Sequence, residues 1–93
     1  MTEPEPPLVS HPDTRRRRLL FRATHRGTYE NDLLLGGFVR DNLLAFTEAD
    51  IDALEALMEL PDVDLADWLT GRRPIDPLAG PPMLLRIRAS LMR

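Results

Sequence analysis

The stretch 47–70, TEADIDALEALMELPDVDLADWLT, carries the clearest structural signal of the chain. Its apolar residues recur every three or four positions, which places them on one face of a helix. Thr47 stands where it can cap this helix, and Asp50 follows three residues later in a loose version of the capping box. Pro61 ends the helix because proline cannot continue helical hydrogen bonding, and a short second helix is expected over 63–70. The expected buried face of the first helix consists of Ile51, Leu54, Leu57 and Met58.

Helices are also expected on both sides of this stretch. The preceding part predicts helices over 14–25 and 29–44, and the following part predicts a proline-rich connector over 72–82 and a last helix over 82–91. Aliphatic β-branched residues are scarce, which disfavours strands. The sequence therefore predicts an all-α fold, a small five-helix bundle that forms a single domain over 14–93. The other expected buried stripes are Leu19, Leu20 and Ala23; Leu34 and Phe38 with Val39 or Leu35; Leu65, Trp68 and Leu69; and Met83, Leu84, Ile87 and Leu91.

A glycine pair, Gly36-Gly37, lies in the middle of the helix expected over 29–44. Each glycine destabilises a helix by about 1 kcal/mol relative to alanine, so the pair needs a reason to be there. We expect a close approach between helices or a kink at this point, and not the end of the helix.

The first 13 residues differ in composition from the rest of the chain. They contain four prolines and two glutamates and no apolar run. A secretory signal needs a basic start and an apolar centre, and a transit peptide is poor in acids, so neither is expected here. We therefore expect residues 1–13 to be a disordered tail and the protein to be cytoplasmic.

Composition excludes several classes of site. The chain of 93 residues has no cysteine, which rules out disulfides, iron–sulfur clusters and thiolate zinc sites, and its two histidines cannot form a histidine-rich metal site alone. No apolar run approaches the roughly 18 residues of a membrane span, so no membrane insertion is expected. There is no glycine-rich phosphate loop and no nucleophile motif. We expect no catalytic residue, no metal and no cofactor of its own, hence no enzyme, and a monomer when free.

The charges are separated into blocks. Residues 15–26 carry six arginines and no acid, whereas residues 27–71 carry eleven acids against Arg40 alone. One hypothesis is a small regulator that binds nucleic acid through Arg15–Arg18, which requires a basic face unbroken by acids. The acidic block argues against it, because phosphates would be repelled, and we expect no nucleic-acid partner.

The segment 22–32, RATHRGTYEND, lies between the first two expected helices. Gly27 allows a positive φ and lets another surface approach closely, and Arg26 and Glu30 flank it with opposite charges. One interpretation is a structural joint in a helical adaptor. In that case Arg26 and Glu30 would pair with each other or with neighbouring side chains.

The same residues carry a resemblance to a known family. Arg26-Gly27-x-x-Glu30, followed by Asp32, resembles the RGxxE signature of the succinate dehydrogenase assembly (flavinylation) factors. The segment 62–69, DVDLADWL, is similar to the D-x-D-L-x-x-W-[LI] segment of that family, and the resemblance covers about residues 15–93. Asn31 departs from it, because the family usually has leucine or methionine there.

The resemblance implies a protein that is not itself an enzyme. Such factors bind the flavoprotein subunit of succinate dehydrogenase, or in some bacteria of fumarate reductase, and promote covalent attachment of FAD to a histidine of that subunit. We expect the side chains of Arg26 and Glu30 to be exposed on one surface with Gly27 between them. The partner-binding residues that the resemblance implies are Arg22, Arg26, Gly27, Glu30 and Asp32.

Overall fold

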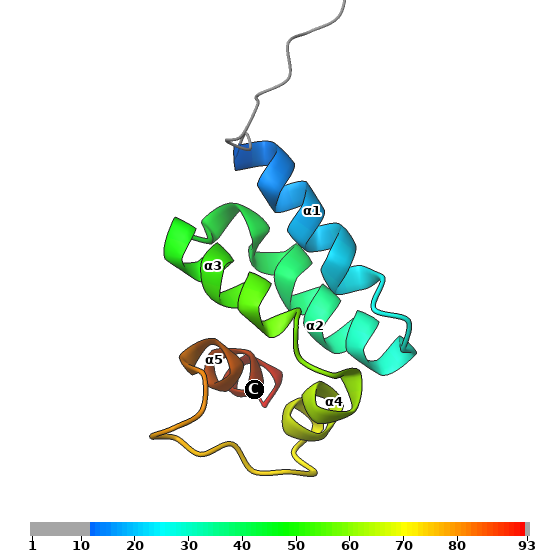
Figure 1. Ribbon diagram of the computed structural model, residues 1–93, viewed down its shortest axis with the longest axis vertical. Helices are drawn as coiled ribbons and strands as arrows, with labels where there is room; N and C mark the ends of the chain where they lie inside the picture. The colour runs from blue at the N-terminus through cyan, green and yellow to red at the C-terminus, as the bar shows by residue number, and fades with distance from the viewer. Residues whose placement is uncertain (1–11, 93) are drawn as a thin grey trace, which may run out of the picture.

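The computed structural model describes residues 12–92 and contains only helices and loops over that range (Figure 1). The predicted all-α fold with five helices is therefore confirmed. The tail expected over 1–13 lies, up to residue 11, outside the described residues. In chain order the elements are α1 (Pro12–Thr24), α2 (Tyr29–Asn42), the short 3₁₀ helix η1 (Leu43–Ala45), α3 (Glu48–Leu57), α4 (Asp62–Thr70) and α5 (Pro82–Leu91).

The helix boundaries follow from the local chemistry of the sequence. Helix α1 begins at Pro12, two residues before the expected start, and the last turn of the second expected helix is η1. The capping box of α3 is present: the Asp50 backbone N–H donates to Thr47 Oγ1 at 3.1 Å, and the Thr47 N–H donates to the Asp50 carboxylate at 3.0 Å. Gly71 ends α4 at a φ of 85°, which glycine adopts without strain.

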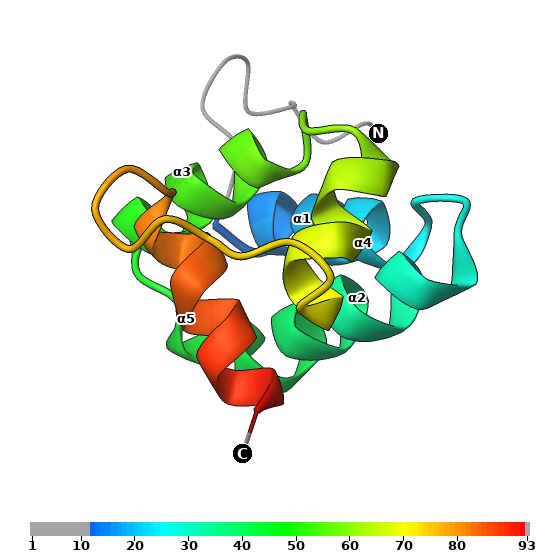
Figure 2. The same cartoon turned by 90° about the horizontal axis from the view of Figure 1, so that it is seen from below.

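The helices form two groups. Figure 1 shows α1 and α2 as an antiparallel pair with α3 beside them, and α4 and α5 below this group. The view from below shows the connector between α4 and α5 crossing in front of both helices (Figure 2). Helix α4 packs on α2 and α5, and α5 also contacts α2 and α3. The joint between α1 and α2, residues 25–28, lies near the start of α4.

One hydrophobic core joins all five helices. The predicted face of α3 is buried, as are most residues of the other predicted stripes. Every helix contributes at least two side chains. The buried hydrophobic residues are Leu19, Ala23, Leu35, Phe38, Val39, Phe46, Ile51, Leu54, Leu57, Met58, Leu65, Leu69, Met83, Leu84 and Ile87.

Four of the five expected buried stripes need correction, because each contains a residue that is not fully buried: Leu20 in α1, Leu34 in α2, Trp68 in α4 and Leu91 in α5. In α2 the buried leucine is Leu35, and Leu34 is only partly buried. Because Leu33, Leu34 and Leu35 are consecutive, the sequence alone does not show which of them faces the core. In the structure the buried face contains Leu35 and continues through Phe38. Leu91, expected in the stripe of α5, is exposed at the end of that helix. Partly buried residues around the core include Leu20, Leu34 and Trp68.

Gly36 marks the close approach between α1 and α2. A Cβ at this position would lie 2.8 Å from Thr24 Cγ2 and 3.0 Å from the Ala23 carbonyl oxygen. At Gly37 it would meet only the Arg40 side chain, at 3.8 Å. Helix α2 continues through both glycines. The expectation of a close approach is confirmed, and it belongs to Gly36.

Candidate functional site

The joint between α1 and α2 is built around Gly27. This residue is exposed and has a φ of 98°, and an added Cβ would meet no atom within 4 Å. The predicted positive φ is thus confirmed. Asp32 fixes the joint from the first turn of α2, because one of its carboxylate oxygens accepts the backbone N–H of Arg26 at 2.7 Å. The Asp32 N–H in turn donates to the Thr28 carbonyl oxygen at 3.0 Å.

Arg26 points inward, so the prediction that its side chain is exposed is wrong. Only 10 % of the side chain is accessible. Its Nη1 donates to the Met58 carbonyl at 2.6 Å and its Nη2 to the Leu60 carbonyl at 2.7 Å. Its Nε donates to the Asp62 carboxylate at 2.7 Å. The physical reason is that carbonyls beyond the end of a helix need donors, and a guanidinium offers several in one plane.

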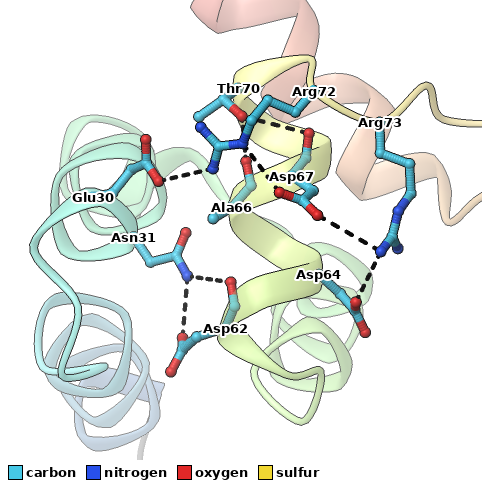
Figure 3. A network of polar contacts seen from close by, with 9 residues as sticks. All are labelled: Glu30, Asn31, Asp62, Asp64, Ala66, Asp67, Thr70, Arg72 and Arg73. Carbon is cyan, nitrogen blue, oxygen red and sulfur yellow. Dashed lines mark hydrogen bonds and ion pairs between the residues drawn. The ribbon is translucent and has the colours of Figure 1, made fainter.

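We call the three hydrogen bonds from the Arg26 guanidinium to Met58, Leu60 and Asp62 the Arg26 clamp. Asp62, at the start of α4, connects this clamp to α2. Besides Arg26, it accepts two hydrogen bonds from Asn31, which is fully buried in α2. The Asn31 Nδ2 donates to the Asp62 carbonyl at 2.9 Å and to its carboxylate at 3.1 Å (Figure 3). These contacts orient the amide, since both Asp62 atoms are acceptors. The joint, α2 and α4 are therefore connected through one aspartate.

Glu30 lies on the outer side of the same structure, and its predicted exposure is confirmed. Its side chain is 45 % exposed and accepts a hydrogen bond from Arg72 Nη2 at 3.2 Å. Arg72 also donates through Nε to the Asp67 carboxylate at 3.1 Å. These contacts, first the one with Asp67 and then the one with Glu30, raise the pKa of Arg72. Glu30 and Arg26 thus have different partners, and the local ion pair between them does not form.

A shallow groove runs between α2 and α4 beside this outer network. Val63 stands on one side of it and is 72 % exposed, although it is apolar. We call this feature the α2–α4 groove. It is lined by Thr28, Glu30, Asp62, Val63, Ala66, Asp67 and Arg72.

Arg22 lies one turn before the joint and faces solvent. Its Nη2 donates to the Glu59 carboxylate at 2.7 Å, and both side chains are largely exposed. The five residues that the resemblance implied therefore divide into two sets. Arg26 and Asp32 hold the joint internally, whereas Gly27, Glu30 and Arg22 are accessible.

The basic run at the start of α1 is divided between the interior and the surface. Arg15 binds the carboxylates of Glu48, Asp52 and Glu55 on α3, and Arg16 donates to the carbonyls of Leu43 and Phe46. Only Arg17 and Arg18 are exposed along the run. The unbroken basic face that the nucleic-acid hypothesis requires is absent from this run.

Between residues 12 and 92 no helix is both long enough and apolar enough to cross a membrane. The same residues contain no cluster of three or more histidine, aspartate or glutamate side chains arranged to bind a metal ion. The expectation that the chain is not an enzyme stays a prediction.

Sequence reasoning did not identify Asn31, Asp62 and Arg72 as parts of this site. The sequence places Asp62 at the start of a helix and in the segment 62–69 that resembles the family, and Arg72 in a connector, without assigning either to the site. The available signal was weak: a polar residue at a position that the helical pattern of α2 places near the core. Asn31 is that residue, and its burial indicates a specific polar partner.

Comparison with known proteins gives consistent results. The family model described as flavinator of succinate dehydrogenase matches residues 17–91. The chain is 49 % identical over 73 residues to the FAD assembly factor SdhE of Acetobacter pasteurianus, a match that covers 78 % of this chain and 67 % of that protein. It is 38 % identical over 66 residues to a mitochondrial succinate dehydrogenase assembly factor 2 of Scheffersomyces stipitis, covering 71 % of this chain and 44 % of that protein. The corresponding protein of Mycosarcoma maydis is 38 % identical over 63 residues, which are 68 % of this chain and 26 % of that protein. The chain thus spans less than half the length of these two mitochondrial relatives.

Proposed function

The chain belongs to the family of succinate dehydrogenase flavinators, and we propose that it binds the flavoprotein subunit of succinate dehydrogenase and promotes covalent attachment of FAD to it. The observation that carries the proposal is the extent of the family match. It includes both the joint between α1 and α2 and the start of α4, which the structure brings together. The names of the relatives agree with this function.

In this proposal the chain contributes positioning and no chemical step of its own. The new bond forms between the flavin and a histidine of the partner, and both groups belong to the partner complex. A protein that holds two reacting groups in the right geometry can lower the barrier by several kcal/mol. A rigid surface that binds one conformation of the flavoprotein subunit is sufficient for this purpose.

The residues of the joint have different parts in this surface. Gly27 allows close approach of the partner, because it presents backbone without a side chain. Glu30 supplies a carboxylate that can accept charge-assisted hydrogen bonds from the partner. Arg26 and Asp32 act as positioning residues, since their bonds fix the backbone that carries Gly27 and Glu30. Arg22 lies at the edge of this contact.

The test is the amount of covalent flavin on the partner subunit in cells that carry variants of this chain. Gly27→Val places a branched side chain in the contact and strains a positive φ, and Glu30→Ala removes the accepting carboxylate. We expect both to lower in-gel flavin fluorescence of the flavoprotein subunit severalfold. Gly37→Ala is the matched control, because the added methyl group meets only the Arg40 side chain.

Circular dichroism of the purified variants checks that each is folded. Folded Gly27→Val and Glu30→Ala proteins that support normal covalent flavin would contradict the proposed site. The isolated chain should show no enzymatic activity of its own, either as wild type or as any of these variants.

The second candidate is a helical adaptor without a flavoprotein client. The burial of Arg26 in an internal network favours it, because an adaptor needs this arginine only for its fold. A pull-down from the source cell distinguishes the two. Recovery of a flavoprotein of the succinate dehydrogenase type supports the assembly factor, and its absence favours the adaptor.

A further inference from the structure

Glu30 and Asp67 hold a single guanidinium between two helices. Glu30 is in the first turn of α2 and Asp67 is in the second half of α4. Arg72 donates to both, at 3.2 Å and 3.1 Å, and so bridges the α2–α4 groove (Figure 3). The groove therefore already has the geometry to bind an arginine side chain.

The Arg72 side chain is only weakly held in the α2–α4 groove. Its side chain is 55 % exposed, and it belongs to the connector after α4 and not to a helix. Exposed ion pairs contribute little to stability, because water and salt screen them and two long side chains must be ordered. A competing arginine needs to overcome only this small contribution.

Asn31, the neighbour of Glu30 in α2, has a buried acceptor without a hydrogen-bond donor. Oδ1 of Asn31 is the one buried side-chain nitrogen or oxygen between residues 14 and 92 that has no hydrogen-bond partner. In Figure 3 this oxygen points away from Asp62, toward the side on which Glu30 and Arg72 meet. A buried acceptor without a donor is unfavourable, so a ligand that supplies an N–H there gains affinity.

We propose that the α2–α4 groove binds an arginine side chain of the flavoprotein subunit, and that Arg72 occupies this position in the free protein. The proposal rests on the proposed function, which supplies the partner. A guanidinium has five N–H donors in one plane, enough for Glu30, Asp67 and the Asn31 oxygen together. Exposed Val63 on the wall of the groove can contact the aliphatic part of such a side chain.

Arg72 could instead assist partner binding, and this role predicts the opposite change in affinity when Arg72 is removed. If Arg72 served to orient Glu30 for the partner, its removal would weaken binding. If it competes with the partner, its removal strengthens binding. The sign of the change therefore decides between the two roles.

The first measurement is the affinity of the purified chain for the flavoprotein subunit by isothermal titration calorimetry. We expect Arg72→Ala to bind about two- to fivefold more tightly, the range that loss of its two weak, exposed ion pairs with Glu30 and Asp67 allows. Arg86→Ala is the control, because it also removes one exposed arginine that is ion-paired, in its case with Asp50 on α3. It should leave the affinity unchanged.

Glu30→Gln tests whether the gain comes from the groove. It should weaken binding by itself, and adding Arg72→Ala to it should give less tightening than in the wild-type background, because only the Asp67 carboxylate is then freed. Equal or weaker binding by Arg72→Ala, or the same tightening by Arg86→Ala, would overturn the competition while leaving the proposed function intact. If the wild-type chain does not bind the flavoprotein subunit at all, the proposed function and the partner named here both fail.

The second measurement needs no partner. The Arg72→Ala protein is titrated with N-ethylguanidinium and, separately, with N-ethylammonium while the Asn31 side-chain amide signals are followed by NMR. We expect saturable shifts with the guanidinium only, and weaker ones in the wild-type chain. Shifts that do not saturate, or that are equal for both cations, would show that the groove does not select a guanidinium. Asn31→Leu in the Arg72→Ala background should weaken the guanidinium affinity as read from backbone signals of α4, and an unchanged affinity would remove Asn31 from the site.

Discussion

Two arginines bind carboxylates of α4: Arg26 binds Asp62 on the buried side of the contact between α2 and α4, and Arg72 binds Asp67 on its exposed side. On the buried side, Arg26 reaches Asp62 and two backbone carbonyls and is almost inaccessible. On the exposed side, Arg72 reaches Asp67 and Glu30 and remains in contact with solvent. The chemistry of the pairs is the same, but their environment differs. Burial makes the first pair part of the fold, and exposure leaves the second available for exchange.

A substitution in the hydrophobic core gives the largest expected loss of stability, with which the effects of the arginine variants can be compared. Leu54 is fully buried on the best-defined face of α3. Leu54→Ala should lower the free energy of unfolding by roughly 2–4 kcal/mol, through lost burial and the cavity that remains. Urea denaturation measures this change. A loss below about 0.5 kcal/mol would mean that Leu54 does not lie in the core.

Arg26→Ala tests the buried side of the comparison directly. It leaves the carbonyls of Met58 and Leu60 and the Asp62 carboxylate without their donors, so we expect a loss of about 2 kcal/mol in the free energy of unfolding. Arg26→Lys keeps the charge but not the planar fork, and should recover part of the loss. Unchanged urea stability of Arg26→Ala would place this arginine with Arg72 as a surface group.

The pH dependence of stability extends the comparison to a third arginine, Arg15. Its hydrogen bond is the main cause that lowers the pKa of Glu55, while the Thr47 backbone N–H is the main cause that lowers the pKa of Asp50. Carboxylates with lowered pKa values stabilise the folded state at neutral pH. This contribution is lost as the pH falls through their folded-state pKa values.

The urea midpoint should therefore decrease between about pH 6 and about pH 3. Glu55→Gln removes one of these carboxylates, so its midpoint should fall less over the same range. A fall of the same size in this variant would show that the Arg15 pair does not contribute to the pH dependence.

The smallest effect on stability is expected on the exposed side. Glu30→Gln breaks only the outer pair with Arg72, so the free energy of unfolding should change by less than about 0.5 kcal/mol. Thermal melting followed by circular dichroism measures it. A change as large as that of Arg26→Ala would show that the two sides do not differ in the way described here.

Local patterns account for what could be predicted from the sequence. Helix α3 was predictable because its cap, its apolar spacing and its terminating proline all lie within one short stretch. The positive φ at Gly27 and the close approach at Gly36 were predictable from the special geometry of glycine. The position of Leu35 was left open, because three consecutive leucines fit more than one face of a helix.

The orientation of Arg26 could not be predicted in the same way. Its acceptors on Met58 and Leu60 are more than 30 residues away in the chain and are backbone carbonyls, which every residue has. Only the packing of the turn between α3 and α4 brings them to the joint. The same holds for Asn31, whose partner Asp62 is 31 residues away.

The Arg26 clamp has a consequence for the thermodynamics of partner binding. An arginine side chain at an interface usually loses much rotational freedom on association, and this conformational entropy opposes binding. With the three donors of Arg26 already engaged in the free protein, that loss has occurred during folding. The backbone at Gly27 is then presented in a preorganised form. Loosening the clamp without unfolding the chain, as in Arg26→Lys, should therefore make the entropy of binding less favourable.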